Sequence, residues 1–135
     1  MKKILFLLLA VLVLVGCQSK SITGKTVSTV AGSYQNITPA ELETMLKNKD
    51  FVLVNVHIPF AGNIPGTDLS IPYNEIEQNL TQLPADKAAK IVLYCSSGRM
   101  SQIAAEELVS IGYTNIWNLK GGMADWQQAG FELEK

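Results

Sequence analysis

The sequence is poor in the residues that hold metals or bind nucleic acids. Its 135 residues include a single histidine, His57, and two cysteines, Cys17 and Cys95. A structural zinc site needs about four ligands, so we expect no metal, and nothing in the sequence calls for another cofactor. Arg99 is the only arginine, and the formal net charge is -1. Without a basic stripe to neutralise phosphates, the chain is not expected to bind nucleic acid.

The first 16 residues have the form of a secretory signal peptide. Lys2 and Lys3 precede an unbroken apolar run from Ile4 to Val15. The run has about 12 residues, well short of the roughly 20 that a helix needs to span a bilayer. A cleaved export signal is therefore favoured, and a short anchor that stays attached is the alternative.

The apolar run closes with residues that resemble the bacterial lipobox, Leu14 to Cys17. The resemblance implies that Cys17 becomes the acylated first residue of the mature protein. It also implies more than one acyl chain, since a single chain binds membranes only marginally. The expected location is the cell envelope, lipid-anchored and extracytoplasmic, on the periplasmic side or at the outer membrane of a Gram-negative host.

The chain after the lipobox divides into a tether and one domain. Residues 17–33 are rich in Ser, Thr, Gly and Lys, which is typical of a flexible tether. We therefore divide the chain into a signal peptide (1–16), an acylated cysteine with its tether (17–33) and a single domain (34–135).

Strands alternate with helices along this domain. The predicted strands cover 34–37, 51–56, 91–94 and 114–119. The predicted helices cover 39–48, 73–83, 101–111 and 123–129, and the stretch 57–70 is predicted as a loop. Two of the strands are continuous apolar runs, which is typical of strands buried on both faces. The order indicates an α/β fold with a central, mainly parallel sheet flanked by helices on both faces.

Cys95 and His57 each follow one of the two buried strands. Because ligands bind outside the carboxyl ends of parallel strands, both residues are expected at the same edge of the sheet. Cys95 opens a loop of small residues that leads through Met100 into a helix. The backbone N–H groups of such a loop form an anion-binding nest, and the helix adds its positive end. A helix end contributes only about 0.3–1 kcal/mol, so we expect the amides and Arg99 to supply most of the stabilisation of a Cys95 thiolate.

The segment from Leu93 to Ser101 resembles the active-site loop of the rhodanese family. Two further segments agree with that family, namely 62–67 followed by Ile71-Pro72 and a C-terminal signature. The signature consists of Gly112-Tyr113, 118–123, Trp126 and Gly130. The resemblance covers about residues 34–132 and implies a single rhodanese-like α/β domain. It also implies that Cys95 accepts a sulfane sulfur as a persulfide and passes it to a thiophilic acceptor.

Two catalytic residues follow from this loop, Cys95 and Arg99. The expected substrate-binding residues are Ser96, Ser97, Gly98, Met100, Ser101 and His57. Each candidate has a simpler structural alternative. Cys95 would be a buried structural thiol, Arg99 a solvated charge and His57 a neutral loop residue. The serines and Gly98 would merely suit a tight turn.

Four positions depart from the family pattern: Asn55, His57, Asn63 and Ser96. The family usually has D-V-R at the end of the second strand, His at the position of Asn63, and often Arg after the cysteine. The loop nevertheless keeps six residues, the length found in members that handle sulfur. A phosphatase-like loop of the form C-x5-R would need arginine at the position of Ser101, so phosphatase activity is not expected.

Two functional hypotheses follow. The leading one is an extracytoplasmic sulfurtransferase of the thiosulfate:cyanide type, with a small sulfur-containing anion or a persulfide as donor and a thiol or cyanide as acceptor. The alternative, which the four departures motivate, is a non-catalytic module that binds a small anion or a partner protein at the envelope. A thiol redox protein or arsenate reductase is disfavoured, because Cys95 has no partner cysteine once Cys17 is acylated. We expect a monomer that meets the membrane only through its lipid anchor.

Overall fold

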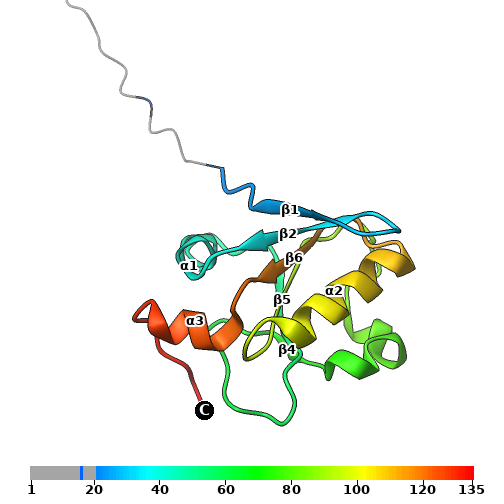
Figure 1. Ribbon diagram of the computed structural model, residues 1–135. Coiled ribbons are helices and arrows are strands. Elements are labelled where there is room, and N and C mark those ends of the chain that lie inside the picture. The colour runs from blue at the N-terminus through cyan, green and yellow to red at the C-terminus, as the bar shows by residue number, and fades with distance from the viewer. Residues whose placement is uncertain (1–15, 17–20) are drawn as a thin grey trace, which may run out of the picture.

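The computed structural model describes residues 16 and 21–135 (Figure 1). Apart from Gly16, the predicted signal peptide lies outside the described residues, and so does Cys17. The strands are β1 (Lys25–Ser28), β2 (Ser33–Ile37), β3 (Val52–Asn55), β4 (Leu69–Ser70), β5 (Ile91–Tyr94) and β6 (Ile116–Leu119). The helices are α1 (Pro39–Leu46), α2 (Arg99–Ile111) and α3 (Gly122–Gln128), with the 3-10 helices η1 (Tyr73–Glu75) and η2 (Glu77–Gln82). No helix in this part of the chain is long and apolar enough to cross a membrane.

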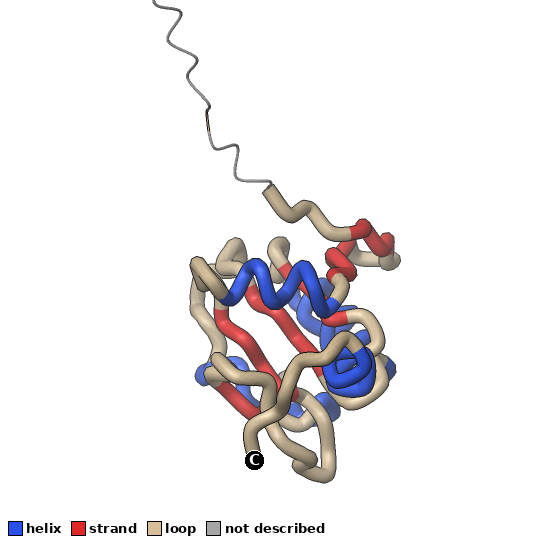
Figure 2. The backbone as a smooth tube through the Cα atoms, turned by 90° about the vertical axis from the view of Figure 1, so that its left-hand side faces the viewer, coloured by secondary structure: helices blue, strands red, loops and turns tan. Residues whose placement is uncertain are grey.

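The six strands form one sheet in the order β1-β2-β6-β5-β3-β4. All neighbouring pairs are parallel except β1 and β2, which are antiparallel. Helices α1 and α3 pack on one face, while α2, η1 and η2 pack on the other, so that helices lie on both sides of the strands (Figure 2). The predicted α/β architecture is confirmed.

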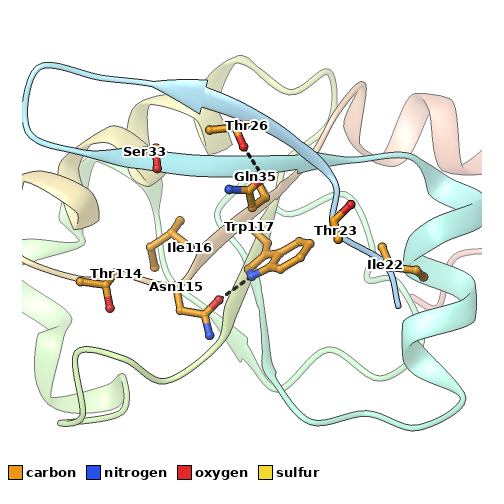
Figure 3. A pocket seen from close by; sticks show the side chains of 9 residues that line it. All are labelled: Ile22, Thr23, Thr26, Ser33, Gln35, Thr114, Asn115, Ile116 and Trp117. Carbon is orange, nitrogen blue, oxygen red and sulfur yellow. Dashed lines mark hydrogen bonds between the residues drawn. The ribbon is translucent and has the colours of Figure 1, made fainter. Parts of the chain in front are cut away.

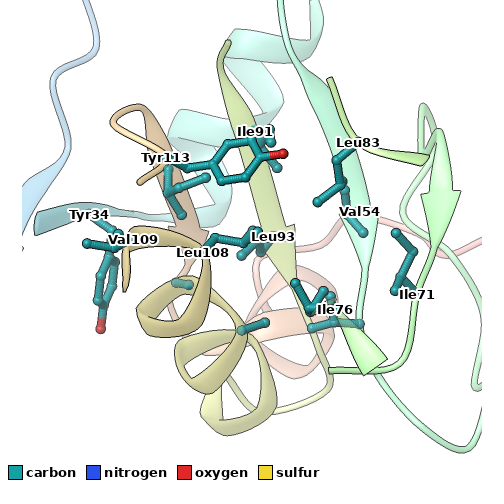
Figure 4. Packing of buried hydrophobic residues seen from close by; sticks show 14 of the residues in the cluster. Tyr34, Val54, Ile71, Ile76, Leu83, Ile91, Leu93, Leu108, Val109 and Tyr113 are labelled. Carbon is teal, nitrogen blue, oxygen red and sulfur yellow. The ribbon is translucent and has the colours of Figure 1, made fainter. Parts of the chain in front are cut away.

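Two apolar cores separate the sheet from its helices. Along β5, Ile91 and Leu93 belong to the core under α2, whereas Val92 and Tyr94 belong to the core under α1 and α3. This alternation explains why a strand buried on both faces has a continuous apolar sequence. In the first core, Leu108 of α2 points toward Leu93 (Figure 4).

The N-terminal hairpin corrects the predicted domain boundary. Residues 25–28 were expected to be part of a tether that ends at residue 33, but they form β1 and pair with β2 from Lys25↔Asn36 to Ser28↔Ser33. β2 is therefore not an edge strand, and the folded domain begins before residue 34. The strand escaped prediction because it has only four residues and a single apolar side chain, Val27, which packs against the core.

The hairpin also frames a cavity of about 420 Å³ beside β6 (Figure 3). Thr26 donates a hydrogen bond to Gln35 at 3.0 Å on one side of this cavity. Trp117 donates its indole N–H to Asn115 at 2.7 Å on the other. The first bond joins β1 to β2, and the parallel pairing of β2 with β6 joins the hairpin to the rest of the sheet. Part of the predicted tether therefore belongs to the domain.

The segment predicted as a helix over 73–83 is instead the pair η1 and η2. Asn79 interrupts it with φ -120° and ψ 19°. The Asn79 side chain donates to Glu75 O at 2.7 Å and accepts from Gln82 at 2.8 Å. An asparagine that bonds to nearby backbone in this way competes with α-helical hydrogen bonding. The predicted loop 57–70 contains the short strand β4 at its end.

The predicted first residue of α1 and the predicted last residue of α2 are confirmed, and each has a local cause. Thr38 caps α1 by accepting the N–H of Glu41 at 3.2 Å, and its hydroxyl donates to the Glu41 carboxylate at 3.1 Å. Thr38 is thus the N-cap of α1, and its side-chain bond with Glu41 holds the capping hydroxyl in place. Gly112 ends α2 with φ 110°, a left-handed conformation that favours glycine.

Replacement of a core leucine tests how much α2 stabilises the fold. We expect Leu108→Ala to lower the free energy of unfolding by about 2–5 kcal/mol, because Leu108 is fully buried. Ile103→Ala is the matched control on the same helix, since Ile103 is 41% exposed; it should cost less than about 1 kcal/mol. Urea unfolding measures the free energy of unfolding of both variants, and equal losses would contradict the packing described.

Candidate active site

The ends of β3 and β5 bring Cys95 and His57 to one edge of the sheet. The parallel register pairs Asn55 with Tyr94, and Val56 donates its N–H to Tyr94 O at 2.9 Å. Cys95 is thus beside Val56, with His57 one residue further along. The two residues share the carboxyl edge of the sheet, as the sequence predicts.

The Cys95 sulfur is buried and faces hydrogen-bond donors. The residue is only 1% exposed. Its Sγ accepts the backbone N–H of Gly98 at 3.0 Å and lies 3.5 Å from the Ser101 hydroxyl. The same hydroxyl lies 3.2 Å from Gly98 O. The sulfur thus lies in the interior, among hydrogen-bond donors of its own loop.

The loop curls around the sulfur because α3 holds its carbonyls. Met123 donates its N–H to Cys95 O at 2.8 Å, and Ala124 donates to Ser96 O at 2.9 Å. These two bonds fix the first two peptide units of the loop, and the Gly98 N–H that follows them donates to the sulfur. Gly98 completes the turn with φ 100°, a conformation that L side chains rarely adopt.

Gly122 is a site residue whose role the sequence did not reveal. A Cβ at this position would lie 2.3 Å from Cys95 O and 2.7 Å from Ser96 O. Only glycine lets α3 approach the loop this closely. The Gly121-Gly122 pair was the available signal, but the sequence alone indicates a turn and not which backbone the turn contacts.

The other predicted binding residues are placed around the loop without contacting the sulfur. Ser96 and Met100 are half-buried and Ser97 is exposed. Arg99 is exposed too, and within the described part of the chain its side chain forms neither a hydrogen bond nor an ion pair. Arg99 lines a neighbouring cavity with Lys120. The geometry therefore places amide and hydroxyl donors, and not the guanidinium, next to Sγ.

His57 lies beside the loop with an unused ring nitrogen. Its backbone N–H donates to Asn55 Oδ1 at 2.9 Å. Its Nδ1 is buried and has no hydrogen-bond partner among residues 21–135. A buried polar atom without a partner is uncommon and points to a missing water or ligand.

Two of the four departures from the family pattern belong to a buried polar network. Asn55 donates to Gly62 O at 2.9 Å and to Asn63 Oδ1 at 3.0 Å. The Tyr94 hydroxyl donates to the same Asn63 oxygen at 3.2 Å and accepts the N–H of Ile64 at 3.0 Å. Asn55 and Asn63 thus fasten the loop after β3 to β5, the strand that leads into Cys95.

The sequence matches the model of the rhodanese-like domain over residues 38–129. The chain belongs to the rhodanese-like family. The rhodanese fold accounts for the order of strands and helices and for the cysteine at the end of β5. The N-terminal residues 1–18 match a prokaryotic membrane lipoprotein lipid attachment site.

Three relatives illustrate the rhodanese similarity. An uncharacterised Synechocystis protein is 34% identical over 101 residues, which are 73% of this chain and 55% of that protein. A sulfurtransferase of Allochromatium vinosum is 30% identical over 94 residues, which are 67% of this chain and 85% of the relative. A rhodanese-like domain protein of Staphylococcus aureus has a solved structure with a TM-score of 0.61 and 30% identity, covering 74% of this chain and 98% of that one. The chain spans about half the length of the Synechocystis relative, and these similarities support a sulfurtransferase-type role.

The close approach of α3 to the rhodanese loop can be tested at Gly122. We expect Gly122→Ala to push the loop carbonyls away from α3, lower the midpoint of urea unfolding and shift the Gly98 amide resonance. The control Gly130→Ala also has positive φ, but its Cβ would enter open space, so it should cost only about 1–2 kcal/mol. Equal destabilisation by Gly122→Ala and Gly130→Ala, with an unmoved Gly98 resonance, would contradict the close contact between α3 and the loop carbonyls.

Tyr94, a member of this buried network, should make the free energy of unfolding depend on pH in the alkaline range. Burial raises the pKa of Tyr94 above its ordinary 10.0, more than the hydrogen bonds with Thr67 and Ile64 lower it. The unfolded chain therefore loses this proton first, so the stabilisation is complete below pH 10 and is lost as the pH rises through the folded-state pKa.

Removal of the Tyr94 hydroxyl should reduce the loss of stability that occurs as the pH rises. We expect Tyr94→Phe to cost about 1–3 kcal/mol at pH 7, because the Ile64 N–H loses its acceptor. Its unfolding free energy should then fall less steeply above pH 10 than that of the parent. Tyr73→Phe is the control, since the Tyr73 hydroxyl makes no hydrogen bond among residues 21–135. Parallel pH curves for parent and Tyr94→Phe would refute the assignment.

Proposed function

We propose that the chain is a lipid-anchored, extracytoplasmic sulfurtransferase that carries a sulfane sulfur on Cys95 as a persulfide. The observation that carries the proposal is the Gly98 N–H aimed at Sγ at 3.0 Å, in a loop at the carboxyl edge of a rhodanese-like sheet. Relatives named sulfurtransferases support it. The same relatives do not favour the alternative of a non-catalytic binding module.

The first step transfers sulfur from the donor to Cys95. The thiolate attacks the outer sulfur of thiosulfate, a bond forms between the two sulfurs, and the S–S bond of thiosulfate breaks. Sulfite leaves with the electron pair of that bond. No external oxidant or reductant is needed, because the donor brings the oxidised sulfur with it.

The loop donors then stabilise the persulfide. The Gly98 N–H and the Ser101 hydroxyl lie next to Sγ, and they are the donors to which we assign this role. An S–S bond of about 2.05 Å moves the reactive sulfur outward from the buried Sγ. Burial of Sγ is compatible with transfer for this reason, since the acceptor has to reach only the outer sulfur.

The second step returns Cys95 to its starting state. A thiol or cyanide acceptor attacks the outer sulfur, and the S–S bond of the persulfide breaks with its electrons on Sγ. Cyanide gives thiocyanate, and a deprotonated thiol gives a new persulfide. Because no other cysteine occurs in residues 21–135, the acceptor thiol comes from another molecule.

His57 and Arg99 have supporting roles in the proposal. The unpartnered Nδ1 of His57 is suited to bind a proton-bearing group of donor or acceptor at the edge of the loop. Arg99 is exposed, so its charge acts on the approach of the anionic donor and not on Sγ. The half-buried Ser96 and Met100 are assigned to contacts with the donor, whereas Ser97 is exposed and lines the same neighbouring cavity as Arg99.

The lipid attachment match supports a location at the envelope. We propose export by residues 1–16, acylation of Cys17, and a tether that ends before β1 at Lys25. The protein then meets the membrane through its anchor alone, as a monomer on the extracytoplasmic side.

The decisive experiment is intact mass spectrometry of the full-length chain before and after thiosulfate. We expect a gain of one sulfur atom that cyanide removes as thiocyanate. Cys95→Ser should abolish the gain and reduce thiosulfate:cyanide transfer by at least roughly a thousandfold. Ser110→Ala, which replaces an exposed serine of α2, should behave as the parent.

Two results would refute the sulfurtransferase. One is a parent chain that never gains sulfur under these conditions. The other is a Cys95→Ser variant that transfers sulfur at the parental rate.

A further inference from the structure

A second cavity lies behind the Cys95 loop. It has a volume of about 420 Å³ and is bordered by the N-terminus of α2, the beginning of α3 and the ends of β2 and β6. Gly98 and Gly121 form part of its wall, whereas Cys95 does not. Its volume falls within the roughly 300–1,000 Å³ that is usual for ligand pockets.

The floor of this cavity carries an unsatisfied acceptor. Asn118 of β6 is only 3% exposed. It is in register with Asn36 of β2 and donates its Nδ2 to Asn36 Oδ1 at 2.9 Å. Its own Oδ1 is buried without a hydrogen-bond partner in the described part of the chain. An acceptor of this kind calls for an N–H or O–H donor from outside the chain.

The rim of the cavity is charged. Arg99 and Lys120 provide two cations and Asp125 one carboxylate, and all three side chains are exposed. None of them forms an ion pair with another described residue. The pair of cations suits a carboxylate, while Asp125 suits an ammonium group.

We propose that this cavity binds a small peptide-like molecule that carries a carboxylate together with an N–H donor. The N–H of the ligand donates to Asn118 Oδ1 on the floor. Its carboxylate lies between Arg99 and Lys120 at the rim. A simple inorganic anion fits less well, because it offers the Asn118 oxygen no donor.

The site is separate from the sulfur but shares the loop with it. Gly98 borders the cavity and also donates its N–H to Sγ. A Cβ at Gly98 would lie 3.1 Å from the N of Gly121, which shows how closely loop and α3 pack at this wall. A ligand in the cavity therefore contacts the same backbone that orients the donor of Cys95.

The test is a titration of the full-length, detergent-solubilised chain with glycylglycine, followed by amide chemical shifts. We expect saturable shifts of the Gly98 and Gly121 amides and of the Asn118 side-chain amide. Acetate has a carboxylate but no N–H donor, so its dissociation constant should be about tenfold higher or more. Glycylglycine should bind Cys95→Ser as it binds the parent, so a failure of sulfur transfer leaves this result unaffected.

Two variants and a control complete the test. Asn118→Leu should raise the dissociation constant of glycylglycine about tenfold by removing the acceptor. Lys120→Ala, at an exposed position that tolerates change, should raise it several-fold even if Asn118→Leu fails to fold. Asn48→Ala, an exposed asparagine after α1, should bind as the parent does.

The proposal is overturned if glycylglycine causes no saturable shift, which would leave water as the only partner of Asn118. It is overturned equally if acetate binds as tightly as the peptide. Unchanged affinity in the Lys120→Ala variant would also overturn it.

Discussion

Two hydrogen bonds from the first turn of α3 determine the shape of the site. The N–H groups of Met123 and Ala124 hold the carbonyls of Cys95 and Ser96. A peptide unit is planar, so turning these two carbonyls toward α3 turns the N–H groups of Ser96 and Ser97 away from it. The arrangement requires glycine at 122, since any Cβ there would collide with both carbonyls. The C-terminal helix thus controls a cysteine that lies more than twenty residues earlier in the chain.

The donors at the sulfur are dipoles and not full charges. The Gly98 N–H and the Ser101 hydroxyl face Sγ, whereas the only arginine in the sequence, Arg99, is exposed and borders another cavity. The sequence suggested that Arg99 would stabilise the thiolate, because its position in the loop says nothing about the direction of its side chain. Buried dipoles are screened by salt much less than surface charges. The environment of Cys95 is accordingly set by the fold and only weakly by ionic strength.

The sequence predicted best where a short segment carries its own signal. The apolar runs predicted β3 and β5. The start of α1 and the end of α2 were also predicted, where Thr38 and Gly112 provide local caps. It failed where the deciding contact is distant in sequence. β1 is too short and polar to be recognised without its partner β2, and the role of Gly122 depends on carbonyls of another loop. The same holds for Asn55 and Asn63, which look like losses from a family pattern until their mutual hydrogen bond is known.

Buried polar atoms without hydrogen-bond partners point to the carboxyl edge of the sheet without the use of any sequence motif. In the part of the chain that the structure describes, two buried side-chain atoms lack a partner, His57 Nδ1 and Asn118 Oδ1. His57 follows β3 and Asn118 lies on β6, and these strands flank β5, which leads into Cys95. Folded proteins satisfy nearly all buried polar groups, so two exceptions on the strands that flank one loop call for a common explanation. Both proposals use these atoms: a second molecule completes the hydrogen bonding of the nitrogen after β3 in the one and of the amide oxygen on β6 in the other.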